Sequence, residues 1–333
     1  MKVLVTGASS LLGGAVAQRL SDRGDEVTVF QRRPSSLEVA ERLGDVEDRE
    51  AVDAAVEGAE AVVHLAARVS ATGAWPAFEA TNVHGTANLV AAARAADVRR
   101  FVQVSSPSVA HAGTSLVGAA AAPANPATAR GHYSKSKAEA ELLALAAAAE
   151  GFSVVAIRPH LVWGPGDTQL VGRIVERARS GRLAIVGSGT ALIDTTYVDN
   201  AADALVAAVD RAPTLNGRAL VVSNGQPRPV AELLSRIVAA AGLAPPRLRV
   251  PAAVARTGGR VVETVWERTG REDDPPMTSF LAEQLATAHW FDQRETRQAL
   301  KWAPVVDLDE GFRRLREWFV SRGRAADASD RLS

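Results

Sequence analysis

The chain has 333 residues, which allows two domains or one large α/β unit with a smaller appendage. Lys and Arg together number 38, as do Asp and Glu, so the formal net charge is zero. We therefore expect no nucleic-acid partner, because phosphate binding requires a basic excess or a basic patch. The absence of cysteine excludes disulfides, thiolate metal sites and a cysteine nucleophile. The six histidines show no metal-binding spacing, so we expect no metal.

The amino terminus reads as a strand followed by a glycine turn and lacks the features of a signal peptide. No run of about 18 mostly apolar residues is present, so we expect no spanning helix. These observations predict a cytoplasmic protein, with contact at a membrane surface as the alternative. The sequence leaves the oligomeric state open, with a homodimer as one option.

Short apolar runs alternate with helical patterns in the first half, the order typical of βαβ units on a parallel sheet. The runs are apolar on both faces, as a sheet covered by helices requires. This pattern predicts a Rossmann-type, doubly wound parallel α/β sheet with a smaller C-terminal substrate-binding domain. We expect strands at 2–6, 27–30, 61–65, 101–104 and 153–157, and helices at 12–23, 76–96 and 132–149.

Beyond Pro159 the pattern is looser, with helices expected at 169–180, 199–211 and 229–241 and strands at 183–186 and 219–222. We place a dinucleotide-binding domain at 1–160 and a mainly substrate-binding region at 161–325. Within that region, about 190–225 is expected to return to the first sheet. The polar tail 326–333 is expected to be frayed.

The segment 3–13 runs from a buried strand through a glycine turn into a helix, the arrangement that dinucleotide binding needs. Gly7 permits the tight turn and Gly13 lets the helix and the strand approach closely. Free N–H groups at the helix start then face the pyrophosphate. Ser10 stands where a middle glycine is usual, and its small side chain still admits a close backbone approach.

The second strand ends in Gln31-Arg32-Arg33. An acidic residue here would accept hydrogen bonds from the adenosine ribose, whereas the guanidinium forks of Arg32 and Arg33 suit a 2′-phosphate. We therefore favour NADP(H), with NAD(H) as the alternative. Asp45 is either an acceptor for the adenine amino group or an ordinary turn residue.

Tyr133 and Lys137 lie four residues apart on an expected helix and so share one face. Tyrosine occurs twice and lysine four times in the chain, which makes the pair informative. A nearby ammonium is expected to lower the pKa of a phenol, so that Tyr133 exchanges a proton with a substrate oxygen. Ser105 and Ser106 follow an expected strand, where a hydroxyl can either bind the substrate oxygen or cap a turn.

Together these residues resemble the extended short-chain dehydrogenase/reductase family, which includes NAD-dependent epimerases, dehydratases and 3β-hydroxysteroid dehydrogenase-like enzymes. The resemblance covers nearly the whole chain, including His64–Ala67, Arg158–Gly166 and Tyr197–Asp199. It implies that Ser106, Tyr133 and Lys137 are catalytic. It also implies a cofactor site that includes the residues of the glycine turn, the two arginines and Asp45 named earlier, as well as Tyr133 and Lys137. The further members of that site are Ser9, Leu11, Leu12, Val46, Leu65, Ala66, Ala67, Asn82, Pro159 and Leu161.

Two departures argue against a sugar-nucleotide substrate. Val109-Ala110-His111 replaces the usual Val-Tyr-Gly, and Ile193 replaces the arginine that grips a diphosphate in those members. The segments 105–109, 161–167, 223–227 and 278–285 instead resemble reductases of 2-alkyl-3-oxoalkanoates, which are apolar β-keto acids. That likeness implies NADPH-dependent reduction, with 250–285 lining an apolar tunnel or forming a plain pair of packed helices. Ser106, Ser108, Trp163 and Trp290 are the expected substrate residues.

Three other activities stay open on the sequence. A 3β-hydroxysteroid dehydrogenase-like enzyme would act on a sterol-like substrate. A nucleotide-sugar epimerase or dehydratase would hold NAD through its cycle. A non-enzymatic NADP-sensing protein would keep the fold, but such proteins typically lack the catalytic tyrosine.

Overall fold

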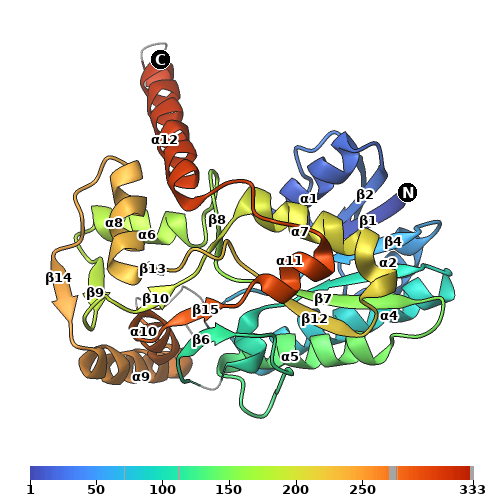
Figure 1. Cartoon of the computed structure of the whole chain (residues 1–333), viewed down its shortest axis with the longest axis horizontal. Coiled ribbons are helices and arrows are strands. Elements are labelled where there is room, and N and C mark those ends of the chain that lie inside the picture. Colours follow the sequence, from blue (N-terminus) through green and yellow to red (C-terminus); the bar gives the residue numbers. More distant parts are fainter. Residues whose placement is uncertain (71, 112, 270–274, 276, 331–333) are drawn as a thin grey trace.

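The computed structural model describes residues 1–70, 72–111, 113–269, 275 and 277–330, and within these ranges a seven-stranded parallel sheet is the largest element (Figure 1). Its strand order is β12-β7-β5-β4-β1-β2-β3. The strands are β1 (Lys2–Thr6), β2 (Glu26–Gln31), β3 (Ala40–Leu43), β4 (Ala61–His64), β5 (Arg100–Val104), β7 (Ser153–Pro159) and β12 (Arg218–Val222).

The sheet changes direction of winding between β1 and β4. From β1 the chain adds β2 and β3 toward one edge, and from β4 it adds β5, β7 and β12 toward the other. All six pairings are parallel, so every strand ends on the same side of the sheet. Ligands of open α/β sheets bind beyond the carboxyl ends at such a switch point.

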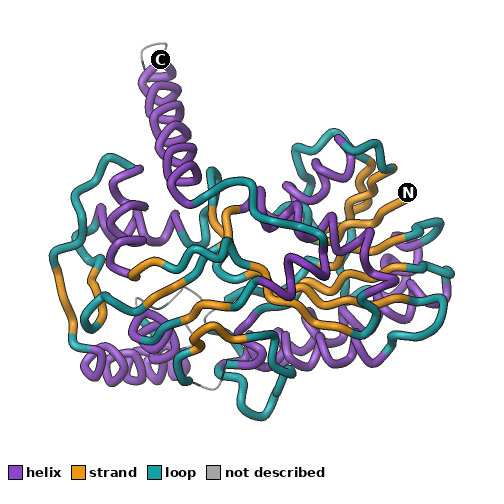
Figure 2. Tube along the Cα trace, in the orientation of Figure 1, coloured by secondary structure: helices purple, strands orange, loops and turns teal. Residues whose placement is uncertain are grey.

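Helices cover both faces of the sheet, because its central strands are buried on both sides. Helices α1 (Leu11–Asp22) and α7 (Val198–Arg211) share a core with one face. Helices α2 (Arg49–Val56), α4 (Gly85–Ala95) and α5 (Gly131–Ala146) pack on the other. Figure 2 shows the strands gathered between these helices. The prediction of a doubly wound, Rossmann-type fold is confirmed.

Smaller sheets carry the remaining strands of the described chain. A four-stranded sheet has the order β13-β10-β15-β6, and two further pairs are β11 with β8 and β14 with β9. Their bounds are β6 (Leu116–Ala119), β8 (Val162–Trp163), β9 (Ala184–Val186), β10 (Leu192–Ile193), β11 (Thr196–Tyr197), β13 (Arg228–Pro229), β14 (Leu248–Val250) and β15 (His289–Phe291).

The other helices lie mainly in the C-terminal half. They are α3 (Trp75–Phe78), the π-helical turn η1 (Glu79–His84), the 3₁₀ turns η2 (Pro107–Ala110) and η3 (Ala212–Thr214), α6 (Val171–Arg179), α8 (Val230–Ala240), α9 (Ala252–Thr269), α10 (Ser279–Ala286), α11 (Arg294–Leu300) and α12 (Leu308–Asp330). Helix α12 projects from the body of the molecule (Figure 1). It continues to Asp330, so the expected frayed tail from 326 is helical up to that residue, and 331–333 lie outside the described residues.

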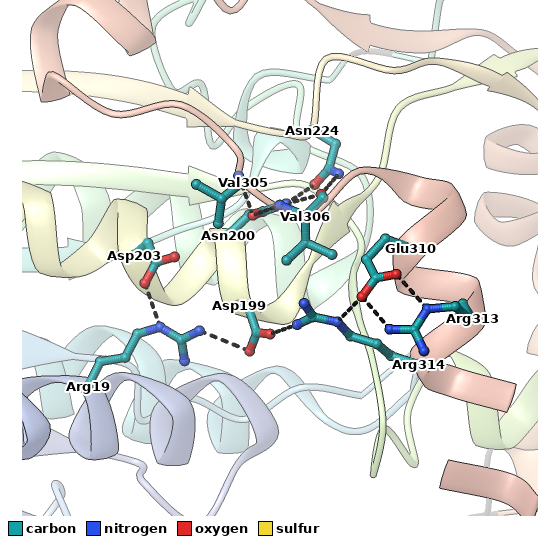
Figure 3. Close-up of polar contacts among 10 residues, drawn as sticks. All are labelled: Arg19, Asp199, Asn200, Asp203, Asn224, Val305, Val306, Glu310, Arg313 and Arg314. Atoms are coloured by element: carbon teal, nitrogen blue, oxygen red, sulfur yellow. Dashed lines mark hydrogen bonds and ion pairs between the residues drawn. The ribbon is translucent and has the colours of Figure 1, made fainter. Parts of the chain in front are cut away.

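Two groups of contacts join distant parts of the chain around α7 (Figure 3). Asp199 accepts from Arg19 of α1 and from Arg314 of α12, each at 3.0 Å. The neighbouring Asn200 is fully buried and binds the backbone of Val305 and Val306. Helix α7 thereby connects the large sheet to the C-terminal helix.

Candidate active site

The glycine turn after β1 is shaped by close backbone contacts. Gly7 has φ +73°, and a Cβ there would lie 2.8 Å from the backbone nitrogen of Ala66. A Cβ at Gly13 would lie 2.3 Å from the carbonyl oxygen of Gly7. Both positions therefore require glycine, for the reasons the sequence predicted.

Ser10 is the N-cap of α1 and closes the turn with its side chain. Its hydroxyl donates to the carbonyl of Gly7 at 2.8 Å and accepts from the N–H of Gly13 at 3.1 Å. The first hydrogen bond within the helix runs from Gly14 to Ser10, so the N–H groups of Leu11 and Leu12 precede it. Such N–H groups at a helix N-terminus are donors for a phosphate. The turn therefore fits a dinucleotide, with exposed Ser9 at its edge.

The two arginines expected to bind a 2′-phosphate directly follow β2. Arg32 and Arg33 are exposed, and Arg32 lies 3.8 Å from the carboxylate of Asp45. The side chain of Gln31 is buried and donates to Glu41, a carboxylate that the sequence analysis did not consider. Hydrogen bonds from Ser35 hold the pKa of Glu41 below its usual range. Arg32 thus lies beside the carboxylate of Asp45, and Glu41 is held by Gln31 and Ser35.

A buried chain of hydrogen bonds fixes the loop after β4. The N–H of Ala66 donates to the hydroxyl of Thr6 at 3.0 Å, and that oxygen lies 2.7 Å from His64 Nδ1. His64 Nε2 lies 3.0 Å from the hydroxyl of Thr86, which donates to the carbonyl of Asn82. Burial lowers the pKa of His64 to about 3, so the ring is neutral. Because the Thr86 hydroxyl donates to Asn82, it accepts a hydrogen bond from His64, so the ring carries its proton on Nε2 and accepts from Thr6 at Nδ1.

Asn82 sits in η1 and connects the loop after β4 to helix α5. Its amide accepts from the N–H of Arg68 at 2.7 Å and donates to the carbonyl of Arg68 and to the hydroxyl of Ser136. The side chain is 1% exposed. These contacts use both N–H groups and one lone pair of the amide, so Asn82 helps to position the loop 65–68, and its contact with a cofactor stays a prediction.

The three expected catalytic residues meet at the carboxyl end of β5. Ser106 follows that strand and lies near Tyr133, in the first turn of α5, where its hydroxyl acts to lower the pKa of the phenol. Lys137, one helical turn further on, is 4% exposed and donates from Nζ to the carbonyl of Val104 at 2.7 Å. The structure thus brings together the residues that the sequence selected.

The pKa of the phenol corrects one expectation. Burial raises the pKa of Tyr133 to about 12, and the hydrogen bond from Ser106 only partly opposes this shift. Burial also lowers the pKa of Lys137 to about 8, while the charge of Glu141 opposes that change. The expected lowering of the phenol's pKa is not found in this structure, because desolvation is the dominant influence and no effect of the Lys137 charge offsets it. At neutral pH Tyr133 is therefore a protonated donor.

The predicted substrate residues lie in different surroundings. Trp163 is 1% exposed, stacks on Phe312 and donates to Thr195, so the expectation that it walls a pocket is corrected: it belongs to the apolar core. Trp290 is partly exposed on β15 and packs over Gly118. Ser108 lies within hydrogen-bond distance of Ser106.

The remaining cofactor candidates line the same edge of the sheet. Pro159 ends β7 and is buried, whereas Leu161 is 39% exposed and has φ +45°. Val46 is buried under α4, where a Cβ at Gly85 would touch it. Leu65, Ala66 and Ala67 are partly buried next to the glycine turn.

The segment expected to line a tunnel forms β14, α9 and α10. Ala255 and Ala282 are buried against each other and against Val186, with Leu285 packed on them, as in a plain helix pair. Residues 270–274 and 276 of this segment lie outside the described residues. Whether the rest borders a substrate stays a prediction.

Two sets of polar contacts near the site were not expected from the sequence, and the first of them is buried. Arg158 and Glu141, each 1% exposed, form an ion pair between β7 and α5. Tyr133, Lys137 and Glu141 follow one another at intervals of four residues. This spacing would have placed Glu141 on the helix face that carries Tyr133 and Lys137.

The second group joins segments that are remote in sequence. His111 lies 2.9 Å from His289, nitrogen to nitrogen, and Arg130 pairs with Glu283 at 2.9 Å. Burial lowers the pKa of His289 to about 3. No local sequence signal could have found these contacts, because the partners are more than 150 residues apart.

Comparison with known proteins agrees with this geometry. The profile of the NAD dependent epimerase/dehydratase family matches residues 3–223. The chain belongs to this family. The prediction of an oxidoreductase that uses a nicotinamide cofactor is thereby confirmed at the level of the family and its named reductases and dehydrogenases.

Individual relatives cover almost the whole chain. The 2-alkyl-3-oxoalkanoate reductase of Stenotrophomonas maltophilia (strain K279a) is 40% identical over 325 residues, which cover 95% of this chain and 98% of the relative. The protein of the same name from Shewanella oneidensis is 37% identical and covers 94% and 84%. The solved structure of MoeE5 in complex with UDP-glucose and NAD superposes with a TM-score of 0.75 at 26% identity, covering 97% and 99%.

Within the described ranges, no group of three His, Asp or Glu side chains is placed to hold a metal ion. In the same part of the chain, no helix is both long and apolar enough to cross a bilayer.

Proposed function

We propose that this reductase converts the ketone of a 2-alkyl-3-oxoalkanoate to a hydroxyl group, with NADP(H) as its preferred cofactor. The observation that carries the proposal is the contact of Ser106 with Tyr133 above Lys137, at the strand ends beside the glycine turn. The named reductases that align over nearly the whole chain support the substrate class.

A nicotinamide, when bound, supplies the hydride for the ketone carbon. The N–H groups of Leu11 and Leu12 would hold the pyrophosphate of the dinucleotide at the start of α1. The guanidinium groups of Arg32 and Arg33 would bind a 2′-phosphate. Gly7 and Gly13 leave the room that the backbone approach needs, as the contacts of a built Cβ indicate.

The protein's own groups handle the substrate oxygen. Ser106 donates a hydrogen bond to the carbonyl and stabilises the charge that develops on it. Tyr133 gives its proton to that oxygen, for which its raised pKa keeps it protonated at neutral pH. The ammonium of Lys137, one turn along α5, stabilises the phenolate that remains.

Ile193 supports an apolar substrate over a nucleotide sugar. It is 4% exposed and pairs with β15 and β13 in the small sheet, so this position offers no cation for a diphosphate. Neighbouring Asp194 is fully buried and accepts from Ser223 and from the backbone of Gly225 and Gln226. Its role is to hold the loop 223–226.

The test is an oxidation assay with NADPH and NADH across three substrate classes: 2-alkyl-3-oxoalkanoates of several chain lengths, 3-ketosteroids and UDP-sugars. We expect turnover of the β-keto acids, with kcat/KM at least about tenfold higher for NADPH than for NADH. Replacing Arg32 and Arg33 together by Ala should remove that preference while leaving NADH kinetics nearly unchanged.

Other outcomes would replace the proposal. Turnover of a ketosteroid alone would indicate a sterol dehydrogenase. Conversion of a UDP-sugar without net cofactor oxidation would indicate an epimerase. Equal use of NADH and NADPH would overturn the assignment of Arg32 and Arg33.

A further inference from the structure

The loop after β5 presents two hydroxyl groups on one side. Ser105, Pro107 and Val109 are buried, whereas Ser106 and Ser108 between them are partly exposed. The alternation places the hydroxyls of Ser106 and Ser108 together, 3.0 Å apart. Tyr133 approaches the same side from α5, close enough for the Ser106 hydroxyl to act on its pKa.

The oxygen of Ser106 accepts two hydrogen bonds from the same residue. The N–H of Ser108 donates to it at 3.2 Å and the hydroxyl of Ser108 donates at 3.0 Å. A hydroxyl oxygen has two lone pairs, so these two bonds use both. The proton of Ser106 must then point away from Ser108, and it is left free to be donated to a substrate oxygen.

We propose that Ser108 is a positioning residue that holds Ser106 as a hydrogen-bond donor, so that the one hydroxyl proton of Ser106 is directed to the substrate oxygen. This inference rests on the proposed roles of Ser106 and Tyr133. Without the Ser108 hydroxyl, one lone pair of Ser106 is free to accept from Tyr133. The phenol would then turn its proton toward Ser106 and away from the ketone.

A purely structural role makes a different prediction. Ser106 is the N-cap of η2, and Pro107 has no N–H, so Ser108 supplies the first backbone donor to the cap. Ser108→Ala keeps that backbone bond and removes only the hydroxyl bond. The fold of the turn should therefore survive the substitution, and a loss of rate would come from the lost orientation.

The experiment compares Ser108→Ala, Ser108→Thr and the control Ser105→Ala. Ser105 is the adjacent serine, and its Oγ is buried without a hydrogen-bond partner among the described residues. We expect Ser108→Ala to lower kcat about tenfold, with the KM of the ketone and of the dinucleotide changed less than twofold. Ser108→Thr should restore the rate, and Ser105→Ala should leave it unchanged.

A further readout separates orientation from damage to the fold. Labelling with 3-fluorotyrosine gives one ¹⁹F signal each for Tyr133 and Tyr197, the two tyrosines of the chain. Ser108→Ala should shift the Tyr133 signal alone, and Ser108→Thr should return it.

An unchanged kcat in Ser108→Ala, or a loss that threonine does not repair, would overturn the proposal. If another ketone is reduced but β-keto acids are not, the proposed function is wrong. The role of Ser108 is then tested by the same comparison of variants with that ketone as substrate. If no ketone is reduced, the ¹⁹F shift decides the role of Ser108 without turnover. An unshifted Tyr133 signal would then contradict it.

Discussion

At the scale of single residues, the site is governed by burial more than by charge. Desolvation moves the pKa of Tyr133 up to about 12 and that of Lys137 down to about 8, so each group favours its neutral form. A neutral, protonated phenol is the form that ketone reduction needs. The arrangement therefore favours proton donation over proton removal near neutral pH.

Tyr133→Phe isolates the proton donor. The ring and its packing remain, but the oxygen that protonates the substrate is lost. We expect kcat to fall by about 10²–10⁴-fold, with dinucleotide affinity within about twofold of the parent by fluorescence titration. Tyr197→Phe is the matched control, since Tyr197 packs edge-on against Trp163 in the core. Full activity in Tyr133→Phe would refute the mechanism.

We predict that the buried Lys137 lowers the free energy of unfolding, although the proposed reaction needs this residue. Its pKa falls from 10.5 to about 8, so the folded protein disfavours the ammonium. The cost, about 3 kcal/mol, is fully present below pH 8 and disappears as the pH rises to 10.5, where both states are neutral. Lys137→Met also loses the bond to Val104, worth about 1 kcal/mol.

We therefore expect Lys137→Met to raise the free energy of unfolding by about 1–2 kcal/mol at pH 7, while it abolishes turnover. The gain should shrink as the pH is raised from 8 toward 10. Urea unfolding at both pH values measures this, with Lys135→Met on the exposed side of α5 as the neutral control. A destabilised variant at pH 7 would show that the buried ammonium is better solvated than its surroundings indicate.

The grouping of the proposed catalytic residues was predictable because each belongs to a local pattern. Tyr133 and Lys137 share a helix face by spacing alone, and Ser106 is recognisable as the end of an apolar strand. The pKa of Tyr133 was not predictable, since it depends on how much protein covers the ring. Likewise, the internal use of Asn82 depends on Arg68 and Ser136, which only the folded chain brings to it.

At the scale of elements, the glycine turn and α1 act as one unit. Gly13→Ala would place a Cβ 2.3 Å from the carbonyl oxygen of Gly7, so the helix must move off the strand. We expect a loss of about 1–3 kcal/mol in unfolding free energy and at least a tenfold weaker dinucleotide affinity by calorimetry. Gly258→Ala, in α9 with open space around it, should be neutral or slightly stabilising. Unchanged affinity in Gly13→Ala would place the dinucleotide elsewhere.

The elements of the large sheet were readable from the sequence, whereas those of the small sheet were not. Strands β1, β5 and β7 are five to seven residues long, and their centres are short apolar stretches that are buried. Strand β10 has two residues, and β15 pairs His289 with Leu116, far away in the chain. Such short strands have no period of their own, so only their distant partners define them.

At the scale of the whole molecule, α7 bears two kinds of long-range contact that should differ greatly in strength (Figure 3). Asp199 is partly exposed, with 28% of its side chain accessible, so its ion pairs with Arg19 and Arg314 are screened by solvent. Asn200 is inaccessible to solvent and makes four hydrogen bonds. Its amide oxygen accepts from the N–H groups of Val305 and Val306, and its amide nitrogen donates to the carbonyl of Val306 and to the side-chain oxygen of Asn224.

Asn200→Ala should therefore detach the segment that leads into α12, because it leaves buried backbone groups without partners. We expect a loss of about 3–5 kcal/mol in unfolding free energy, against less than about 1 kcal/mol for Asp199→Asn. Urea unfolding of the two variants side by side measures the difference, and 0.5 M salt should weaken only the effect of Asp199. Equal losses in both would mean that the ion pairs, rather than the buried amide, hold the C-terminal helix to the large sheet.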